Sequence, residues 1–118
     1  MILGVGVDVC DLERWAQMAR RRPQVVRRLL TAAEAELTLQ SQAARFAAKE
    51  ALAKALGGPA GLSWLEVEVV TTAGGRPSFA WSGGVARAAA DLGVTRHHLS
   101  LSHDGGVAVA VVVLEGEV

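Results

Sequence analysis

The sequence has 118 residues, of which 51% are hydrophobic, and its basic and acidic side chains balance to a formal net charge of zero. With a mean hydropathy of +0.30, these values predict one globular domain over residues 1–118 and exclude a disordered chain. No apolar run reaches transmembrane length, so we expect no membrane span. The N-terminal residues Met1 to Gly4 lack the basic region with which a signal peptide begins, so we expect no signal peptide.

The first predicted element is a strand over residues 2–9, which is apolar and rich in valine. Gly4 and Gly6 inside it indicate a bend or a close backbone neighbour. Asp8 is the candidate functional residue of this strand, because a carboxylate in an apolar strand needs a cation or hydrogen-bond donors. Asp11 has the position of a helix N-cap, so we assign it a structural role. Cys10, the single cysteine, excludes an internal disulfide and suits a reducing cytoplasm, and we expect it to be a small buried residue.

Three helical segments follow the first strand. The helix over residues 12–22 ends at Pro23, and residues 24–30 resume an amphipathic pattern. Thr31 and Glu34 have the spacing of a capping box, which predicts a further helix through roughly residue 39.

A dense cluster of arginines lies on the first two of these helices. Six arginines fall between residues 14 and 28 without a single acidic side chain: Arg14, Arg20, Arg21, Arg22, Arg27 and Arg28. Such a patch attracts an acidic partner, which from the residues alone is a nucleic acid, an anionic lipid or an acidic protein. The alternative is a solvated helix face with no partner.

The central helix is predicted from about residue 43 to residue 56, where Gly57-Gly58-Pro59 ends it. Glu50 and Lys54 are one turn apart, and one interpretation is a surface ion pair worth roughly 0.2–0.5 kcal/mol. The other is a phosphate and metal site, in which Glu50 binds a cation and Arg45 and Lys49, on another side of the helix, hold an anion.

The second half of the sequence favours strands. Glu66 and Glu68 share one face of a predicted strand over residues 65–69, because strand side chains alternate. The element order of one strand, helices, two strands, a helix and two strands indicates an α+β fold with antiparallel pairing. The remaining predicted elements are a turn at 74–77, a strand at 78–82, a helix at 85–92 closed by Gly93, and strands at 98–102 and 107–114 joined by a tight turn at 104–106.

Three stretches together resemble the 4′-phosphopantetheinyl transferases, specifically the short holo-acyl-carrier-protein synthase type. The family has a G-x-D motif on its first strand, R-F-x-x-K-E-A-x-x-K-A on a central helix and H-x-S-L-S-H near its end. The matching stretches are Gly6-Val7-Asp8, Arg45 to Ala55, and His98 to His103, with weaker matches at Leu30 to Glu34 and Gly75-Arg76-Pro77. The resemblance covers essentially the whole chain.

The resemblance implies an antiparallel sheet with a long central helix and flanking helices, and transfer of the phosphopantetheine arm of coenzyme A to a serine of an apo acyl carrier protein. The reaction releases 3′,5′-ADP and uses Mg²⁺, which needs few protein carboxylates. By this resemblance, Asp8 and Glu50 hold the metal, and Lys54 reaches the pyrophosphate or its bridging oxygen. The same resemblance implies that the phosphates of coenzyme A are bound by Arg45, Lys49 and His98.

Some roles stay open at this point. We expect His97 and His103 to be packing residues, because they face the opposite side of their strand from His98. The base that deprotonates the serine is a metal-bound water, Glu50 acting through water, or Asp104. Trp15 and the short segment between Glu34 and Arg45 depart from the family pattern and bear on the choice of carrier protein.

The resemblance also assigns partners. Acyl carrier proteins are strongly acidic, so we expect the six arginines to bind one, Arg14 most firmly, and the association to weaken with salt. The family assembles as homotrimers with active sites between subunits. We expect neither nucleic acid nor membrane as a partner.

Two other functions are consistent with the residues. The first is a non-catalytic basic module that binds an acidic protein or nucleic acid, in which Asp8 and Glu50 are incidental; against nucleic acid, Trp15 is the only aromatic residue within the arginine patch. The second is a small metal-dependent phosphohydrolase with water as the acceptor.

Overall fold

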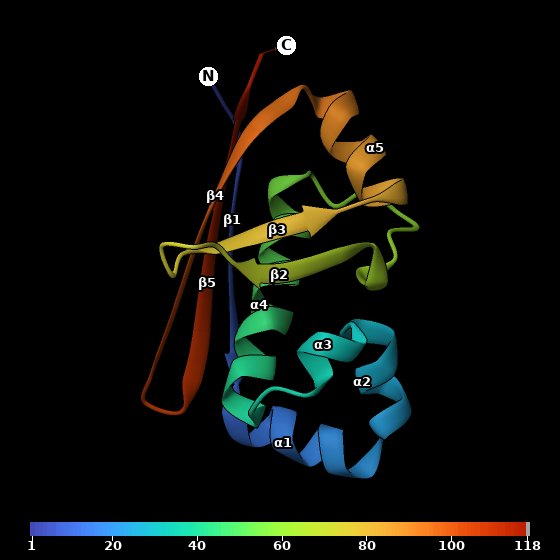
Figure 1. The fold of residues 1–118 in the computed structure, drawn as a ribbon, viewed down its shortest axis with the longest axis vertical. Coiled ribbons are helices and arrows are strands. Elements are labelled where there is room, and N and C mark those ends of the chain that lie inside the picture. Colours follow the sequence, from blue (N-terminus) through green and yellow to red (C-terminus); the bar gives the residue numbers. More distant parts are fainter. Residues whose placement is uncertain (118) are drawn as a thin grey trace.

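The computed structural model describes residues 1–117, so Val118 of the predicted domain lies outside the described part. It contains two antiparallel sheets and a long central helix (Figure 1). None of the helices in this part is both long and apolar enough to cross a membrane. In chain order the elements are β1 (Ile2–Asp11), α1 (Leu12–Arg21), α2 (Pro23–Leu29), α3 (Ala32–Ala35), α4 (Leu39–Ala55), the 3₁₀ helix η1 (Trp64–Glu66), β2 (Val67–Thr71), β3 (Pro77–Trp81), α5 (Gly83–Leu92), β4 (Val94–Asp104) and β5 (Val107–Gly116).

The larger sheet has the strand order β1–β5–β4 and is antiparallel throughout. Gly105 and Gly106, both with positive φ, form the two-residue turn between β4 and β5, which only glycine adopts easily. The register places Asp8, Ala110 and Leu101 in one row across the three strands. The α+β class with antiparallel pairing is therefore confirmed.

Helix α4 packs on one face of this sheet through small residues. Its buried alanines, Ala47, Ala48, Ala51 and Ala55, belong to the main core. Gly4 and Gly6 of β1 face them, and a Cβ atom at Gly6 would overlap the carbonyl oxygen of Ala51. Because neither surface carries bulk, strand and helix approach closely, as the glycines of the sequence predicted.

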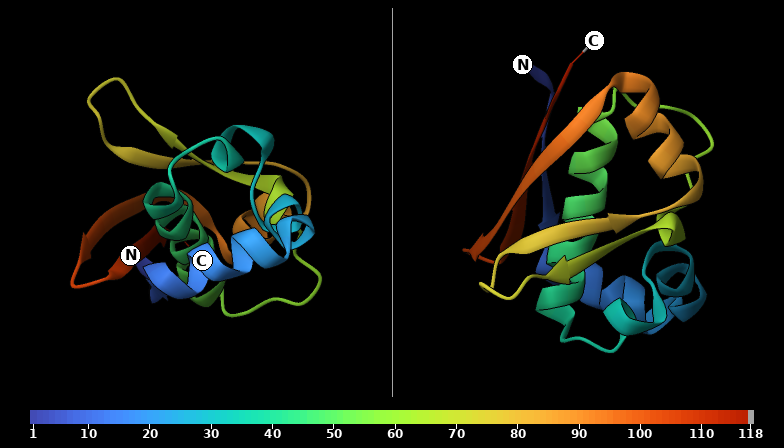
Figure 2. Two further views of the ribbon diagram at one scale, coloured as in Figure 1. Left: turned by 90° about the horizontal axis from the view of Figure 1, so that it is seen from below. Right: turned by 45° about the horizontal axis from the view of Figure 1, so that its top comes forward.

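The remaining elements surround α4 on its other sides. The β2–β3 hairpin lies across α4, with α5 near one end of the molecule and helices α1 to α3 at the other (Figure 1, Figure 2). His97 ties the hairpin to the larger sheet, since its Nε2 accepts a hydrogen bond from the backbone N–H of Phe79 at 3.1 Å. Trp15, Val26 and Leu30 form a second core beneath α1 and α2.

Local capping signals in the sequence are confirmed. The Asp11 carboxylate accepts from the backbone N–H of Arg14 at 2.8 Å and caps α1. Thr31 and Glu34 form a reciprocal capping box. Gly93 ends α5 in the left-handed conformation. Each signal depends on residues three or four apart, so local chemistry suffices to specify it.

Several predicted boundaries are wrong, and the strand expected at 98–102 is the longer β4. The helix expected through residue 39 is the single turn α3, and α4 begins at Leu39 because Thr38 caps it by accepting from the N–H of Ser41. The expected strand at 65–69 begins only at Val67. Glu66 instead belongs to η1, where its carboxylate accepts from the N–H of Gly84 at the start of α5.

The close contact between β1 and α4 gives a stability prediction. Gly6→Ala should lower the free energy of unfolding by roughly 1–3 kcal/mol or more, because the new methyl group overlaps the Ala51 carbonyl. Urea unfolding measures this. Gly74→Ala, in an exposed turn where a methyl group would enter open space, is the matched control and should change stability by only about 0.5 kcal/mol. Equal effects of the two substitutions would contradict the packing described above.

Candidate active site

Asp8 of β1 and Lys54 of α4 meet at one edge of the larger sheet. Lys54 Nζ donates to Asp8 Oδ1 at 2.9 Å and to the carbonyl oxygen of Val7 at 3.1 Å. The Lys54 side chain is 57% exposed and that of Asp8 19% exposed, so the pair opens to solvent on one side. Residues 46 positions apart thus form one charged cluster, which the approach of Gly6 to α4 makes possible.

Glu50 lies one helical turn before Lys54 and completes this cluster. Partial burial and the negative charge of Asp8 raise the pKa of Glu50, while the positive charge of Lys54 lowers it. The two carboxylates therefore repel each other in a partly buried place. A cation between them would remove that repulsion, so the electrostatics favour binding of a positive ion.

The donor set of this cluster fits Mg²⁺. Within residues 1–117 no group of three or more His, Cys, Asp or Glu side chains is arranged to hold a metal. Mg²⁺ does not need such a cage, because it is commonly held by one or two carboxylates, with substrate phosphates and water completing its octahedron. Asp8 and Glu50 supply two such carboxylates beside open space.

The prediction that Lys49 holds coenzyme A phosphates is wrong for this structure. Lys49 is 0% exposed, and its Nζ donates to Leu29 O, Glu34 Oε1 and Trp64 O. An ammonium group has three N–H donors, and all three are used here. The sequence showed Lys49 one turn from Arg45, but not that two carbonyls and a carboxylate enclose it.

Arg45 lies on a different side of α4 from Glu50. Five residues of helix correspond to a rotation of about 140°, so the two side chains leave the helix in nearly opposite directions. Arg45 lines a pocket with Ser102 and His103 of β4, at the opposite edge of the sheet from β1. Its Nε is buried and has no hydrogen-bond partner among the described residues.

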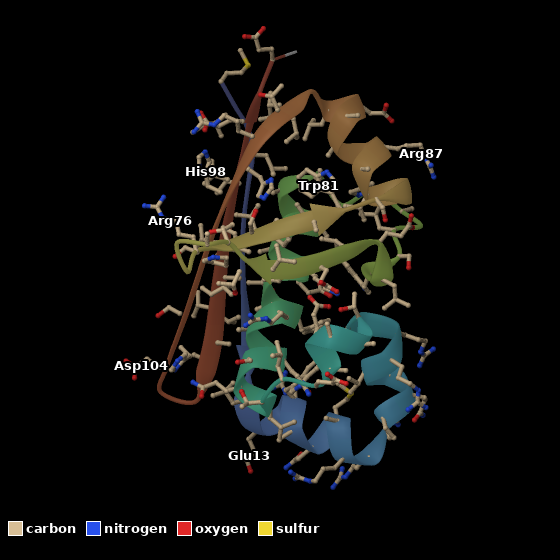
Figure 3. The ribbon with its side chains drawn as sticks, viewed as in Figure 1. Glu13, Arg76, Trp81, Arg87, His98 and Asp104 are labelled. Atoms are coloured by element: carbon tan, nitrogen blue, oxygen red, sulfur yellow. The ribbon has the colours of Figure 1, made fainter. Side chains whose placement is uncertain are left out.

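The histidines of β4 lie in three different surroundings. His98 shares a row with Val5 and Val113 on the sheet face away from α4, where it pairs with Glu115. It points outward beside Arg76 (Figure 3) and is not part of the Asp8 cluster. His97 is packed against Phe79, as expected. The expectation for His103 is wrong, because it is exposed in the Arg45 pocket.

Two further residues considered in the sequence analysis are Asp104, which lies at a hairpin tip, and Cys10, whose thiol is unreactive at neutral pH. Asp104 lies at the tip of the β4–β5 hairpin (Figure 3), where its carboxylate accepts from the N–H of Gly105. Burial, with the nearby charges of Asp8 and Asp11, raises the pKa of Cys10 to about 11. The Cys10 thiol therefore stays protonated at neutral pH. Cys10 is only partly buried, packed against both cores, rather than fully buried as expected.

Comparison with known proteins identifies the family. The family model of the 4′-phosphopantetheinyl transferase superfamily matches residues 4–112. The chain belongs to this superfamily. It is 61% identical to a holo-[acyl-carrier-protein] synthase from Clavibacter sepedonicus, covering 99% of this chain and 98% of the relative.

Two solved structures extend the comparison. A holo-[acyl-carrier-protein] synthase from Neisseria meningitidis has a TM-score of 0.87 at 31% identity and covers 98% of this chain and 99% of its own. One from Bacillus anthracis in complex with coenzyme A (3′,5′-ADP) has a TM-score of 0.79 at 35% identity, with 99% of both chains covered.

The six arginines of this phosphopantetheinyl transferase form an exposed basic surface on α1, α2 and the residue between them. All six side chains are exposed, and Arg14, Arg21 and Arg22 border one shallow hollow with Met18. A deeper and more apolar pocket adjoins it between α1, α2 and β1. The surface therefore offers positive charge around apolar contact area.

The raised pKa of Glu50 gives a test of the cluster. In metal-free protein, Glu50→Gln should raise the thermal midpoint at pH 7–8 by roughly 1–3 °C, because it removes a carboxylate that is less easily ionised in the folded state than in the unfolded state. The gain should vanish below about pH 4, where Glu50 is neutral in both states. Calorimetry across this pH range measures it, with Glu117→Gln as the exposed control; a gain independent of pH would contradict the cause given.

Proposed function

We propose that this chain transfers the 4′-phosphopantetheine arm of coenzyme A to a serine of an apo acyl carrier protein and releases 3′,5′-ADP. The observation that carries the proposal is the Asp8–Glu50–Lys54 cluster, in which two carboxylates and an exposed ammonium meet at one sheet edge. The whole chain would be one catalytic domain, which the match over residues 4–112 supports.

Asp8 and Glu50 would hold Mg²⁺, for which their electrostatics and exposure are suited. When bound, the ion neutralises charge on the pyrophosphate of coenzyme A. The chain itself contributes position: Asp8 is fixed by the pairing of β1 with β5, and Glu50 by the packing of α4 on the sheet.

In the reaction the serine oxygen bonds to phosphorus while the bond from phosphorus to the bridging pyrophosphate oxygen breaks. Lys54, held by Asp8 and the Val7 carbonyl with most of its side chain in solvent, is placed to offset the charge on the leaving 3′,5′-ADP. The serine proton needs an acceptor. Within one chain Glu50, acting through water, is the carboxylate proposed for this role, because it belongs to the cluster whereas Asp104 lies at the hairpin tip.

The transfer is tested by intact-mass spectrometry of an apo acyl carrier protein incubated with this chain, coenzyme A and Mg²⁺. We expect a gain of one phosphopantetheine unit, which EDTA and Glu50→Ala both abolish. Salt-sensitive binding without any gain in mass would support the basic binding module instead. Hydrolysis of coenzyme A without modification of the carrier would support the phosphohydrolase.

The basic surface is proposed to bind the acidic carrier protein. Arg14→Glu combined with Arg21→Glu should lower the association rate constant about tenfold at low ionic strength, because long-range attraction then becomes repulsion. The difference should shrink as salt is added. Arg87→Glu, on α5 at the other end of the molecule (Figure 3), is the control for a charge reversal outside this surface, although it changes the net charge half as much. Equal losses in the two variants, measured by stopped-flow, would rule out a specific docking surface.

We further propose a homotrimer with active sites between its subunits. Arg45 and the Asp8 cluster lie at opposite edges of one sheet, an arrangement that a site built from two copies would accommodate. The sheet face away from α4 supports this, since Val5, Val7 and Val9 are each more than half exposed on it. A reducing cytoplasm, proposed as the location, suits a chain with one free cysteine.

The assembly is tested by light scattering. We expect a mass roughly three times the 12.3 kDa of one chain, and a monomer without transfer activity after Val5→Asp, because a buried unpaired carboxylate is costly. A fully active wild-type monomer would contradict a site shared between copies.

A further inference from the structure

Lys49, the least exposed cation of the described residues, lies outside the Asp8–Glu50–Lys54 cluster. Lys49 is 0% exposed and Glu34, its ion-pair partner, is 1% exposed. The two Glu34 oxygens accept from Lys49 Nζ at 2.6 Å and from the backbone N–H groups of Thr31 at 2.9 Å and Val69 at 2.8 Å. With the carbonyls of Leu29 and Trp64 on Lys49, the pair joins α2, α3, α4, η1 and β2.

Stability alone is a weak reason for such a pair. Removing two charges from water costs about as much as their attraction returns, and apolar residues of similar volume often serve a core equally well. Unlike an apolar contact, the pair is directional, because each of its hydrogen bonds fixes the position of one helix or strand at a set distance and angle. Lys49 and Glu34 therefore define an orientation.

A second buried polar side chain acts on the same side of α4. Gln42 precedes Lys49 by seven residues, which is close to two full turns, so the two side chains project alike. Gln42 Oε1 accepts from Trp15 Nε1 at 3.0 Å, and Gln42 Nε2 donates to Ala35 O at 2.9 Å and Leu37 O at 3.1 Å. Gln42 thereby fastens α1 and the end of α3 to α4.

The two side chains lie between the basic surface and the active cluster. Lys49 holds the carbonyl of Leu29, the last residue of α2, directly after Arg27 and Arg28. The residue after Lys49 is Glu50. Gln42 holds α1, which carries Arg14 and Arg21, through Trp15. One face of α4 therefore sets the arginines, and another face sets the carboxylates.

We propose that Gln42 and Lys49, the latter with Glu34, are positioning residues that hold the arginine-bearing helices in register with Glu50. This inference rests on the proposed function, because it assigns these residues to docking of the carrier serine at the reacting phosphorus. They touch neither substrate. Their loss should misplace the carrier protein and leave the coenzyme A site intact.

The test uses two variants that nearly preserve side-chain volume. Gln42→Met removes three hydrogen bonds, and Glu34→Gln with Lys49→Met removes both charges together, so that neither is left buried alone. We expect each to raise KM for the acyl carrier protein about tenfold and to lower kcat as well, because a misplaced serine reacts more slowly, while KM for coenzyme A changes by less than about twofold. Val85→Ala, on the buried face of α5, is the control for lost stability without lost docking.

The result that overturns the inference is an unchanged carrier KM in Gln42→Met, or an equal rise of both KM values in the folded variants. Gln42→Met decides alone if the charge-free variant does not fold, as judged by cooperative unfolding. Absence of transfer by the wild-type chain would instead refute the proposed function, so the two failures are distinguishable.

Discussion

The close approach of strand β1 to helix α4 is the constraint on which the rest of the structure depends. Gly4 and Gly6 leave room for the Ala55 and Ala51 carbonyls, where any side chain would overlap them. Two residues further along the same face of the strand, Asp8 reaches Lys54. A bulkier strand would stand away from the helix, and the carboxylate of Asp8 would no longer raise the pKa of Glu50. The small residues are therefore what brings Asp8 close to Glu50 and Lys54.

Helix α4 divides its sides among separate tasks. One side packs on the sheet through alanines, the next carries Glu50 and Lys54, and a third holds the arginine-bearing helices α1 and α2 through Gln42 and Lys49. Arg45 leaves the helix toward β4, away from the carboxylates. Arg45 and Glu50 therefore leave α4 on different sides of the helix.

Sequence reasoning succeeded where the deciding chemistry is local. The Asp11 cap, the capping box at Thr31 and the Gly105-Gly106 turn each depend on neighbouring residues. It failed where distant segments decide, because no spacing shows that Leu29 and Trp64 enclose Lys49. The family motifs singled out Asp8, Glu50 and His98 together, but they could not show that His98 faces away from the other two, since the face depends on strand register.

The central claim is that Asp8 and Glu50 act as one unit, and a double-mutant cycle tests it most directly. The value of kcat/KM is measured at saturating Mg²⁺ for Asp8→Asn, Glu50→Gln and the double variant. If the two carboxylates share one ion, either single substitution already removes most of the rate enhancement that the pair provides. The double variant should then have about the same kcat/KM as the slower single variant. Losses that multiply would mean that the two carboxylates act independently and would contradict the account.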